Sequence, residues 1–191
     1  GRLDATGVVQ AAVGVVTHVG LDHTELLGAT RPEIAREKAG IARPGVPLLH
    51  AVTGDAGASV EAEAAQRGAP VENVRATCRA ERLPNGRLAL ATPARNYGAL
   101  ILALPGAHQA WNAALAVRAA ETVAPDLPSG AVADGLGDVA RLAGLRGRGE
   151  AHAADPCLVL DVADNADGWD AALAAVRVPP GGRLHALVGV M

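Results

Sequence analysis

Residues 11–19, Ala-Ala-Val-Gly-Val-Val-Thr-His-Val, form a valine-rich and mostly apolar run that ends at Gly20. Residues 46–52 have the same character. A strand of a parallel sheet is covered on both faces, and its sequence therefore reads as a near-continuous apolar run. We expect both runs to be buried strands of a parallel sheet.

The segment between these two runs carries the signals of a helix. A polar loop over residues 21–29 is followed by Thr30, which stands three residues before Glu33, with Pro32 in the first turn. This spacing is typical of a capping box, in which two side chains satisfy free backbone N–H groups at the start of a helix. It predicts a helix over residues 30–38.

A further helix is expected over residues 58–66. Two strand–helix–strand units in succession predict an α/β fold with a doubly wound, mostly parallel sheet. The pattern then changes to short strand candidates at residues 71–76, 87–92 and 98–104, with the turn Pro84-Asn85-Gly86 before the second of them. These short runs predict an antiparallel patch.

The rest of the chain returns to longer elements. Helices are expected at 108–123 and 130–142, and a strand, a helix and a strand at 157–162, 166–176 and 184–190. The last three elements predict the beginning of a second, Rossmann-like α/β domain.

These elements predict a partial central domain over residues 1–146, a linker over residues 147–155 and the start of the second domain over residues 156–191. The chain begins with Gly1 and ends at Met191 inside an apolar run. A strand that ended there would leave unpaired edge groups, which proteins normally cover or charge. We expect both termini to be truncations.

Composition excludes several classes of protein. Half of the 191 residues are hydrophobic, the net charge is −3, and Tyr97, Trp111 and Trp169 are the three aromatic residues. Nucleic-acid binding needs basic patches and aromatic platforms, so no nucleic-acid partner is expected. The sequence has neither a signal peptide nor an apolar run of the roughly 20 residues that cross a bilayer, which predicts a cytoplasmic protein without membrane contact.

Three polar residues, near the ends of the first strand and of the first helix, are candidates for binding a metal. Asp22 and His23 lie at the carboxyl end of the first strand, where open α/β sheets bind ligands. A carboxylate and an imidazole there could bind a divalent cation, although a loop hydrogen bond is the more common role of such a pair. Lys38 lies near the helix end and is ordinarily a solvated charge. A neutral Lys38 amine could instead react with carbon dioxide to give a carbamate, which is an oxygen ligand for magnesium.

A third group of candidates suits a nucleotide. Asn112 carries an amide donor and acceptor that could read an adenine edge, although it could equally be a helix-surface residue. Arg148 could neutralise phosphate or be a solvated linker charge, and Asp161 at a strand end could accept a ribose hydroxyl.

Five short motifs, taken in order, resemble the folylpolyglutamate synthase/dihydrofolate synthase family of the Mur ligase superfamily. They are Gly-Arg-Leu-Asp-Ala-Thr at 1–6, Gly-Leu-Asp-His-Thr at 20–24, Ala-Arg-Glu-Lys-Ala-Gly-Ile at 35–41, Leu-Pro-Gly-x-His-Gln at 104–109, and Asn112. The resemblance extends over essentially the whole chain. It implies a Mur ligase central domain and an ATP- and Mg²⁺-dependent carbon–nitrogen ligase that adds L-glutamate to dihydropteroate or to a folate through an acyl phosphate.

The resemblance also implies roles for single residues. His23 and a carbamylated Lys38 would be catalytic magnesium ligands, and Asp4 and Ala5 would line the folate or dihydropteroate site. Asn112, Arg148 and Asp161 would contact ATP. The expected partners are these small molecules alone, bound by a monomer.

Two of the departures from the family pattern bear on activity. No G-x-x-x-x-G-K-[ST] phosphate loop occurs, so this chain by itself is expected to be inactive. Asp164 stands where the family pattern Asp-Gly-Ala-His-Asn-Pro has histidine, and a carboxylate near nucleotide phosphates adds repulsion. Two alternatives therefore stay open, a non-catalytic relative that binds nucleotide or pterin and a muramyl-peptide ligase on the same scaffold.

Overall fold

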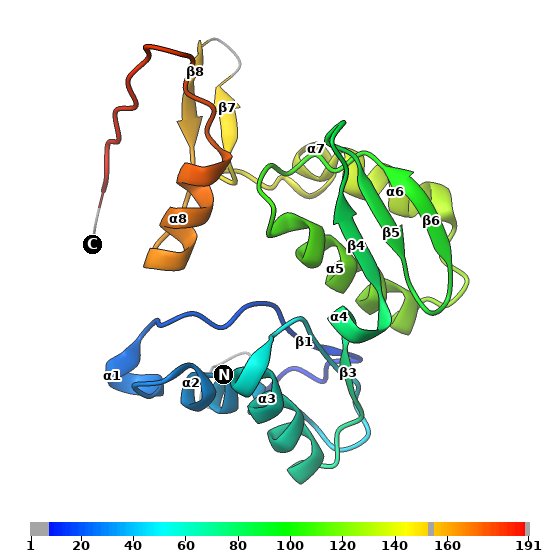
Figure 1. The fold of residues 1–191 in the computed structure, drawn as a ribbon. Helices are drawn as coiled ribbons and strands as arrows, with labels where there is room; N and C mark the ends of the chain where they lie inside the picture. Colours follow the sequence, from blue (N-terminus) through cyan, green and yellow to red (C-terminus); the bar gives the residue numbers. More distant parts are fainter. Residues whose placement is uncertain (1–7, 153–154, 190–191) are drawn as a thin grey trace.

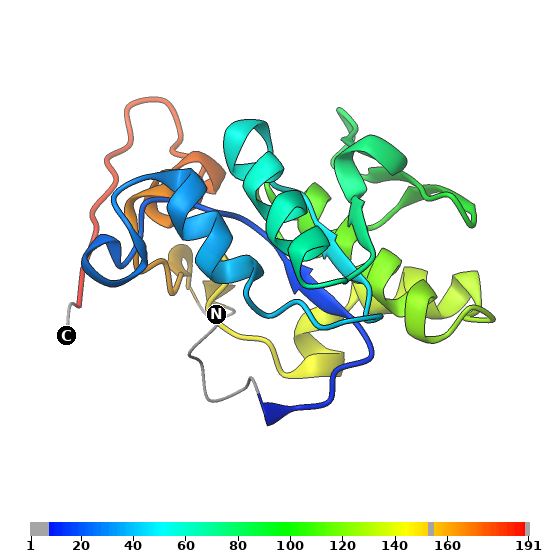
Figure 2. The ribbon, with the colours of Figure 1, turned by 90° about the horizontal axis from the view of Figure 1, so that it is seen from below.

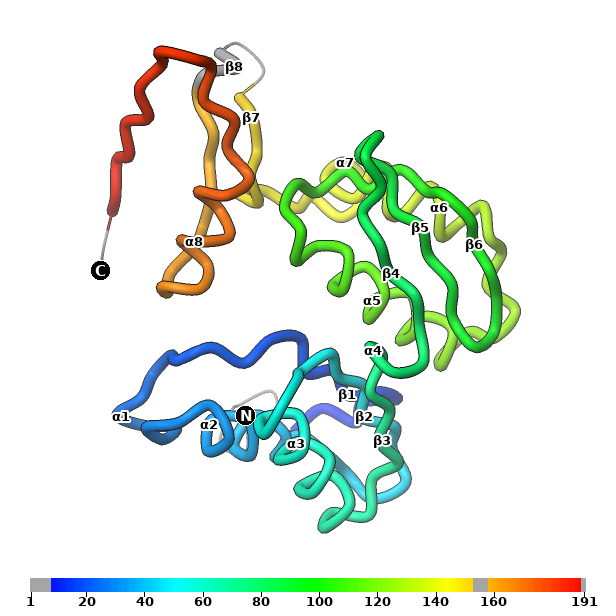
Figure 3. Tube along the Cα trace, viewed as in Figure 1, coloured from blue at the N-terminus to red at the C-terminus, as the bar shows by residue number. Residues whose placement is uncertain are grey.

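The computed structural model describes residues 8–152 and 155–189. In these residues the chain forms a parallel sheet, an antiparallel sheet and a two-stranded hairpin, each with its own helices (Figure 1). The hairpin and its helix stand opposite the parallel-sheet unit, as the tube in Figure 3 also shows. Within the described residues, no helix has both the length and the apolar character that crossing a membrane requires.

The parallel sheet consists of β1 (Gly14–Val16), β2 (Leu48–His50) and β3 (Val71–Asn73), in that order. β1 connects to β2 through α1 (Thr24–Leu27) and α2 (Arg31–Ala39), and β2 connects to β3 through α3 (Gly54–Gln66). The two strand–helix–strand units expected from the sequence are therefore confirmed. The strands are shorter than the apolar runs that predicted them.

The middle strand is buried on both faces, as the apolar run predicted. Leu48 packs with Ile34 and Val60 of α2 and α3 in one hydrophobic cluster. Its neighbour Leu49 packs in a second cluster with Leu115 of α5 (Gln109–Val123). Successive side chains of a strand point to opposite faces, so two adjacent leucines can serve two cores.

The helix α2 begins with the predicted capping box. The Glu33 backbone N–H donates to Thr30 Oγ1 at 3.4 Å, and the Thr30 N–H donates to Glu33 Oε2 at 3.0 Å. Figure 2, which views the molecule from below, shows α2 and α3 lying beside each other.

The third parallel strand corrects the expectation for residues 71–76. Only residues 71–73 are extended, and they join the parallel sheet instead of the antiparallel patch. Asn73 Oδ1 accepts the Arg75 N–H at 3.1 Å, which starts the short helix α4 (Val74–Thr77). An asparagine that hydrogen-bonds the backbone two residues onward favours a turn over a strand.

The antiparallel sheet has the order β4 (Arg79–Arg82), β5 (Leu88–Ala91) and β6 (Asn96–Leu100). β4 was missed because its Arg-Ala-Glu-Arg sequence lacks apolar alternation. It is an edge strand, where charged side chains are tolerated. The turn expected at residues 84–86 joins β4 to β5, with Gly86 at φ 79°.

The predicted helix at 108–123 is confirmed as α5, whereas the predicted helix at 130–142 is two helices. α6 (Ser129–Gly137) ends at Asp138, which has a non-helical backbone, and α7 (Val139–Ala143) follows. Two glycines in the last turn of α6 weaken that helix, since glycine costs about 1 kcal/mol relative to alanine.

The last elements are β7 (Glu150–His152), β8 (Asp155–Leu160) and α8 (Ala166–Ala175). β7 lies within the expected linker and pairs antiparallel with β8. The strand expected at 184–190 is not formed over residues 184–189, and residue 190 lies outside the described residues. The expected parallel strand pair is therefore not seen there.

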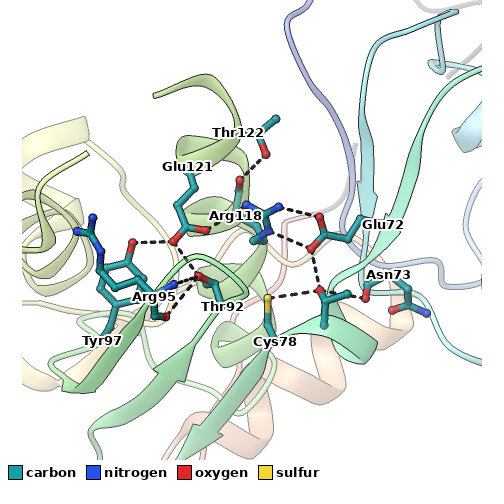
Figure 4. A network of polar contacts seen from close by, with 10 residues as sticks. Glu72, Asn73, Cys78, Thr92, Arg95, Tyr97, Arg118, Glu121 and Thr122 are labelled. Carbon is teal, nitrogen blue, oxygen red and sulfur yellow. Dashed lines mark hydrogen bonds and ion pairs between the residues drawn. The ribbon is translucent and has the colours of Figure 1, made fainter. Parts of the chain in front are cut away.

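A polar network joins the parallel and antiparallel units (Figure 4). Arg118 of α5 donates two hydrogen bonds of 2.9 Å to Glu72 of β3 and a third of 3.1 Å to Glu121. Glu121, which is 7% exposed, also accepts from Thr92 and Tyr97 at 2.8 Å each. The carboxylates of Glu72 and Glu121 thus meet guanidinium and hydroxyl donors, as the burial of polar groups demands.

Candidate active site

A cavity of about 750 Å³ lies where the parallel sheet, the start of α5 and the β7–β8–α8 unit meet. It is large enough for a nucleotide-sized ligand. Lys38, Asn112, Arg148 and Asp161, to which the resemblance assigns roles, all line it, as do Asp22 and Asp164. Side chains from segments far apart in the sequence are thus gathered around one space.

The other three sequence candidates are placed differently. Asp4 and Ala5 lie outside the described residues. Asp22 lines the cavity, but His23 is not part of its wall and its side chain is 69% exposed. His23 Nε2 lies 3.7 Å from Asp22 Oδ1, so the two side chains form a pair at the cavity margin.

The backbone at His23 is unusual. His23 has φ 48° and ψ 42°, and among the described residues it is the non-glycine residue with a positive φ. Its carbonyl accepts from the backbone N–H groups of Leu26 and Leu27 at 2.9 Å, which begins α1. A left-handed conformation at a non-glycine residue costs roughly 1–3 kcal/mol and is concentrated at functional sites.

Lys38 lies in the last turn of α2, half-buried, between the buried residues of that helix. In the part of the chain that the structure describes, the Lys38 ammonium has neither a hydrogen bond nor an ion pair. Its amine therefore faces the cavity without a carboxylate bound to it.

Asn112 lies in the first turn of α5. Its Nδ2 donates to Gln109 Oε1 at 3.0 Å, which fixes the amide plane and leaves Oδ1 and one N–H for a ligand. Gln109 is buried, with 8% of its surface exposed, so the pair forms a rigid wall.

Asp161 holds the segment that carries Arg148. Its two carboxylate oxygens accept from the Gly149 N–H at 2.7 Å and the Ala163 N–H at 2.9 Å. Gly149 has φ 61°, and a Cβ there would lie 2.5 Å from Cγ of Pro105. Only glycine fits where the chain passes Pro105 at residue 149, because a side chain would strain the backbone at this positive φ and would clash with the proline ring.

The charges around the cavity affect His108, which also lines it. Burial lowers the pKa of His108, and the nearby His18 and Arg148 lower it further, while Asp161 opposes them. The neutral imidazole is therefore favoured at this wall.

Sequence reasoning missed the contact that crosses the cavity. Asp167 Oδ2 of α8 lies 2.9 Å from His18 Nε2 and 3.5 Å from an Arg31 side-chain nitrogen. A Cβ on Gly20 would lie 2.4 Å from the same Asp167 oxygen, so glycine permits this close approach. These residues look like ordinary surface polar groups, and no sequence pattern pairs positions 149 residues apart.

No group of three or more His, Cys, Asp or Glu side chains suited to hold a metal occurs within residues 8–152 and 155–189. This donor set still fits magnesium, which usually takes one or two protein carboxylates and completes its shell with phosphate oxygens and water. Asp22, and Lys38 if carbamylated, would supply such donors at the cavity.

The chain matches no protein-family model. It is 40% identical over 126 residues to the Bacillus subtilis dihydrofolate synthase/folylpolyglutamate synthase, covering 63% of this chain and 29% of that protein. It is 37% identical to a probable bifunctional folylpolyglutamate synthase/dihydropteroate synthase of Halobacterium salinarum, covering 100% of this chain and 23% of that protein.

The solved structures give the same result for the fold. Folylpolyglutamate synthase of Mycobacterium tuberculosis, complexed with ADP and AMPPCP, superposes with a TM-score of 0.78 and 31% identity over 92% of this chain and 41% of that one. The chain spans less than a third of the two curated relatives and less than half of this structure. The shared sequence and the shared Mur ligase-like fold place the chain in the folylpolyglutamate synthase/dihydrofolate synthase family.

Proposed function

We propose that the chain forms part of an ATP- and Mg²⁺-dependent ligase that adds L-glutamate to dihydropteroate or to a folate polyglutamate through an acyl phosphate. The observation that carries this proposal is the gathering of Lys38, Asn112, Arg148 and Asp161 around one cavity. The names of the relatives and the ADP and AMPPCP bound to the mycobacterial structure support the same chemistry.

In this reaction the nucleotide would lie along α5 and the expected linker, which would act as a hinge. Asn112 has a free amide oxygen and N–H for the adenine edge, and Arg148 offers a guanidinium for phosphate. Asp161 already accepts two backbone N–H groups, so its main role would be to hold the hinge segment at residues 147–149 beside the ligand. A remaining lone pair could accept a ribose hydroxyl.

His23 and Lys38 would hold the metal. Magnesium, when bound, neutralises the charge that builds on the transferred phosphoryl group and the leaving oxygen. Lys38 would need its carbamate to act as a ligand, because an ammonium repels a cation. The Asp22 carboxylate, which lines the cavity 3.7 Å from the His23 imidazole, would be a further oxygen donor to the ion.

Domain closure would be the task of the C-terminal unit. The contacts of Asp167 with His18 and Arg31 hold α8 over the cavity, where it would keep water from the acyl phosphate. The folate site, with Asp4 and Ala5, remains a proposal from the resemblance. We also propose that the protein is a cytoplasmic monomer.

One observation favours a second candidate, a relative that binds nucleotide without turnover. Asp164 lines the cavity beside Asp161, Asp167 and Asp170, so this wall is acidic. Acidic groups oppose a triphosphate. Replacing Asp164 by histidine should raise ATP affinity if this carboxylate impairs the site, and unchanged affinity would remove the support for the second candidate.

Turnover can be tested in a chimera in which this chain replaces the matching segment of the Bacillus subtilis enzyme. We expect glutamate-dependent ADP release with dihydropteroate or tetrahydrofolate, and a loss of about 100-fold or more in kcat for Lys38→Ala. Arg36→Ala is the matched control, because it removes an exposed basic side chain from the same helix. A folded chimera without turnover, or an unaffected Lys38→Ala, would contradict the proposal.

The carbamate has its own readout on the isolated chain, which by itself should show no turnover. ¹³C NMR in labelled bicarbonate should show a carbamate resonance that disappears in Lys38→Arg. A spectrum without that resonance, with and without Mg²⁺, would remove Lys38 from the proposed ligand set while leaving the ligase assignment intact.

A further inference from the structure

Arg75 of α4 lies flat against the cavity wall in a position that the motifs do not account for. Its guanidinium carbon is 4.4 Å from the centre of the Trp111 ring, and its Nε donates to the Ala51 carbonyl at 2.7 Å. All three residues line the cavity. The guanidinium is thus fixed by an aromatic face on one side and by the end of β2 along one edge.

The charge on this guanidinium is not paired with an acid. Among the described residues Arg75 has no ion pair with a carboxylate, and burial lowers the pKa of Arg75 with no acidic group to offset it. A planar cation that is held in place but lacks a counter-charge can take a ligand on its open face.

The neighbours of Arg75 indicate what that ligand is. Trp111 directly precedes Asn112, whose amide oxygen is free, so a stacking surface and an edge-reading amide share one wall. A guanidinium binds phosphate in a bidentate manner through its Nε–Nη edge or its Nη1–Nη2 edge, and the Ala51 carbonyl occupies Nε, so the first of these edges is taken. The face of the guanidinium remains suited to a flat, electron-rich ring.

We propose that Arg75, held against Trp111, is the platform on which the adenine base stacks while Asn112 reads the edge of the base. This inference rests on the proposed function, because it assumes that the cavity takes a nucleotide. It assigns a base-recognition role to a residue outside all five sequence motifs.

The fluorescence of Trp111 can report ligand binding beside Arg75. The chain has two tryptophans, so Trp169→Phe leaves Trp111 as the fluorophore. The chain with this change is titrated with adenosine, with Mg²⁺–ATP and with tripolyphosphate, and tripolyphosphate binding is followed by calorimetry. We expect saturable changes in Trp111 emission with adenosine and ATP.

In the same background, Arg75→Ala should weaken adenosine and ATP binding by about tenfold and leave tripolyphosphate binding unchanged. Arg75→Lys keeps the charge but lacks the planar face, so it should not restore adenosine binding. Arg79→Ala, in the strand after α4 and outside the cavity wall, is the matched control. Circular dichroism confirms that each variant is folded.

The outcomes separate the two proposals. Equal loss of tripolyphosphate and adenosine binding in Arg75→Ala, or rescue by lysine, would show an anion site and overturn the stacking platform. ATP binding that is insensitive to Arg75 would overturn the platform but keep the nucleotide site. If neither adenosine nor ATP binds to the folded chain, both the platform and the nucleotide site in this chain are wrong.

Discussion

The two units that face each other across the cavity are built in different ways. In the parallel-sheet unit, Ile34 and Leu48 are fully buried at 0% exposure, and helices cover both faces of the sheet. In the β7–β8–α8 unit, α8 buries none of its residues, and apolar side chains such as Leu173 (44% exposed) reach the surface. Hydrophobic packing therefore fixes the cavity wall formed by the parallel-sheet unit. The wall formed by the β7–β8–α8 unit is placed by polar contacts and by close backbone approaches at Gly20 and Gly149.

The largest effect should come from the packed wall. Ile34→Ala removes a fully buried side chain beneath the helix that carries Lys38 and should lower the free energy of unfolding by about 2–5 kcal/mol. Urea denaturation measures it. Leu173→Ala on α8 is the matched variant and should cost less than about 1 kcal/mol, because much of its surface is already in water. Equal losses in the two variants would mean that α8 packs as tightly as α2.

The polar connection of the packed wall to α5 should come next. Arg118→Ala leaves Glu72 and the buried Glu121 without their guanidinium partner, and we expect a loss of about 2–3 kcal/mol, reduced from the fully buried case by partial exposure. The exposed Arg79–Glu81 pair is the control, and Arg79→Ala should cost no more than about 1 kcal/mol. If Arg118→Ala also lowered the free energy of unfolding by no more than about 1 kcal/mol, the network would add nothing beyond an exposed ion pair.

A smaller effect depends on pH. His50, at the end of β2, is fully buried, and among the residues that the structure describes neither ring nitrogen has a hydrogen-bond partner, although Nε2 lies 3.3 Å from Glu61 Oε1. Burial lowers the pKa of His50, and Glu61 only partly opposes this. The unfolded chain then binds the proton more readily, so stability is full above the unfolded pKa of about 6.5 and falls as pH drops below it.

His50→Leu should remove this dependence, which for one proton cannot exceed about 1.4 kcal/mol per pH unit. Urea midpoints between about pH 7.5 and 5.5 measure it, and His50→Leu should be at least as stable as the original chain near pH 6. A pH slope that is unchanged in His50→Leu would assign the acid sensitivity to other groups.

The smallest effect on stability should come from the exposed wall. Asp167→Asn weakens the contacts with His18 and Arg31, which are solvent-exposed and should contribute less than about 1 kcal/mol. We expect these contacts to affect the position of α8 more than the stability of the fold. Spin labels at Leu26 and Leu173, in a background without Cys78 and Cys157, should show a broader distance distribution in Asp167→Asn. An identical distribution would mean that this bridge does not place α8.

The same contrast explains how far the sequence could be interpreted. The parallel sheet, the capping box at Thr30 and helix α5 were predicted correctly because burial and capping leave local patterns. β4 was missed because charged residues conceal an edge strand, and β7 was missed within an expected linker. Lys38, Asn112, Arg148 and Asp161, which were singled out from the sequence, line the cavity, and their roles there stay predictions. Arg75, His18 and Asp167 were not singled out, because their contacts join segments distant in sequence.

The central claim is that the residues of the motifs share one nucleotide site. It is tested most directly by recording amide chemical shifts of the isotope-labelled chain as Mg²⁺–ATP is added. We predict saturable shifts that cluster at Lys38, Asn112 and residues 147–149 and 161–164, with β4 to β6 unaffected. Shifts confined to the antiparallel sheet and α6, or a spectrum unchanged by the nucleotide, would contradict the claim.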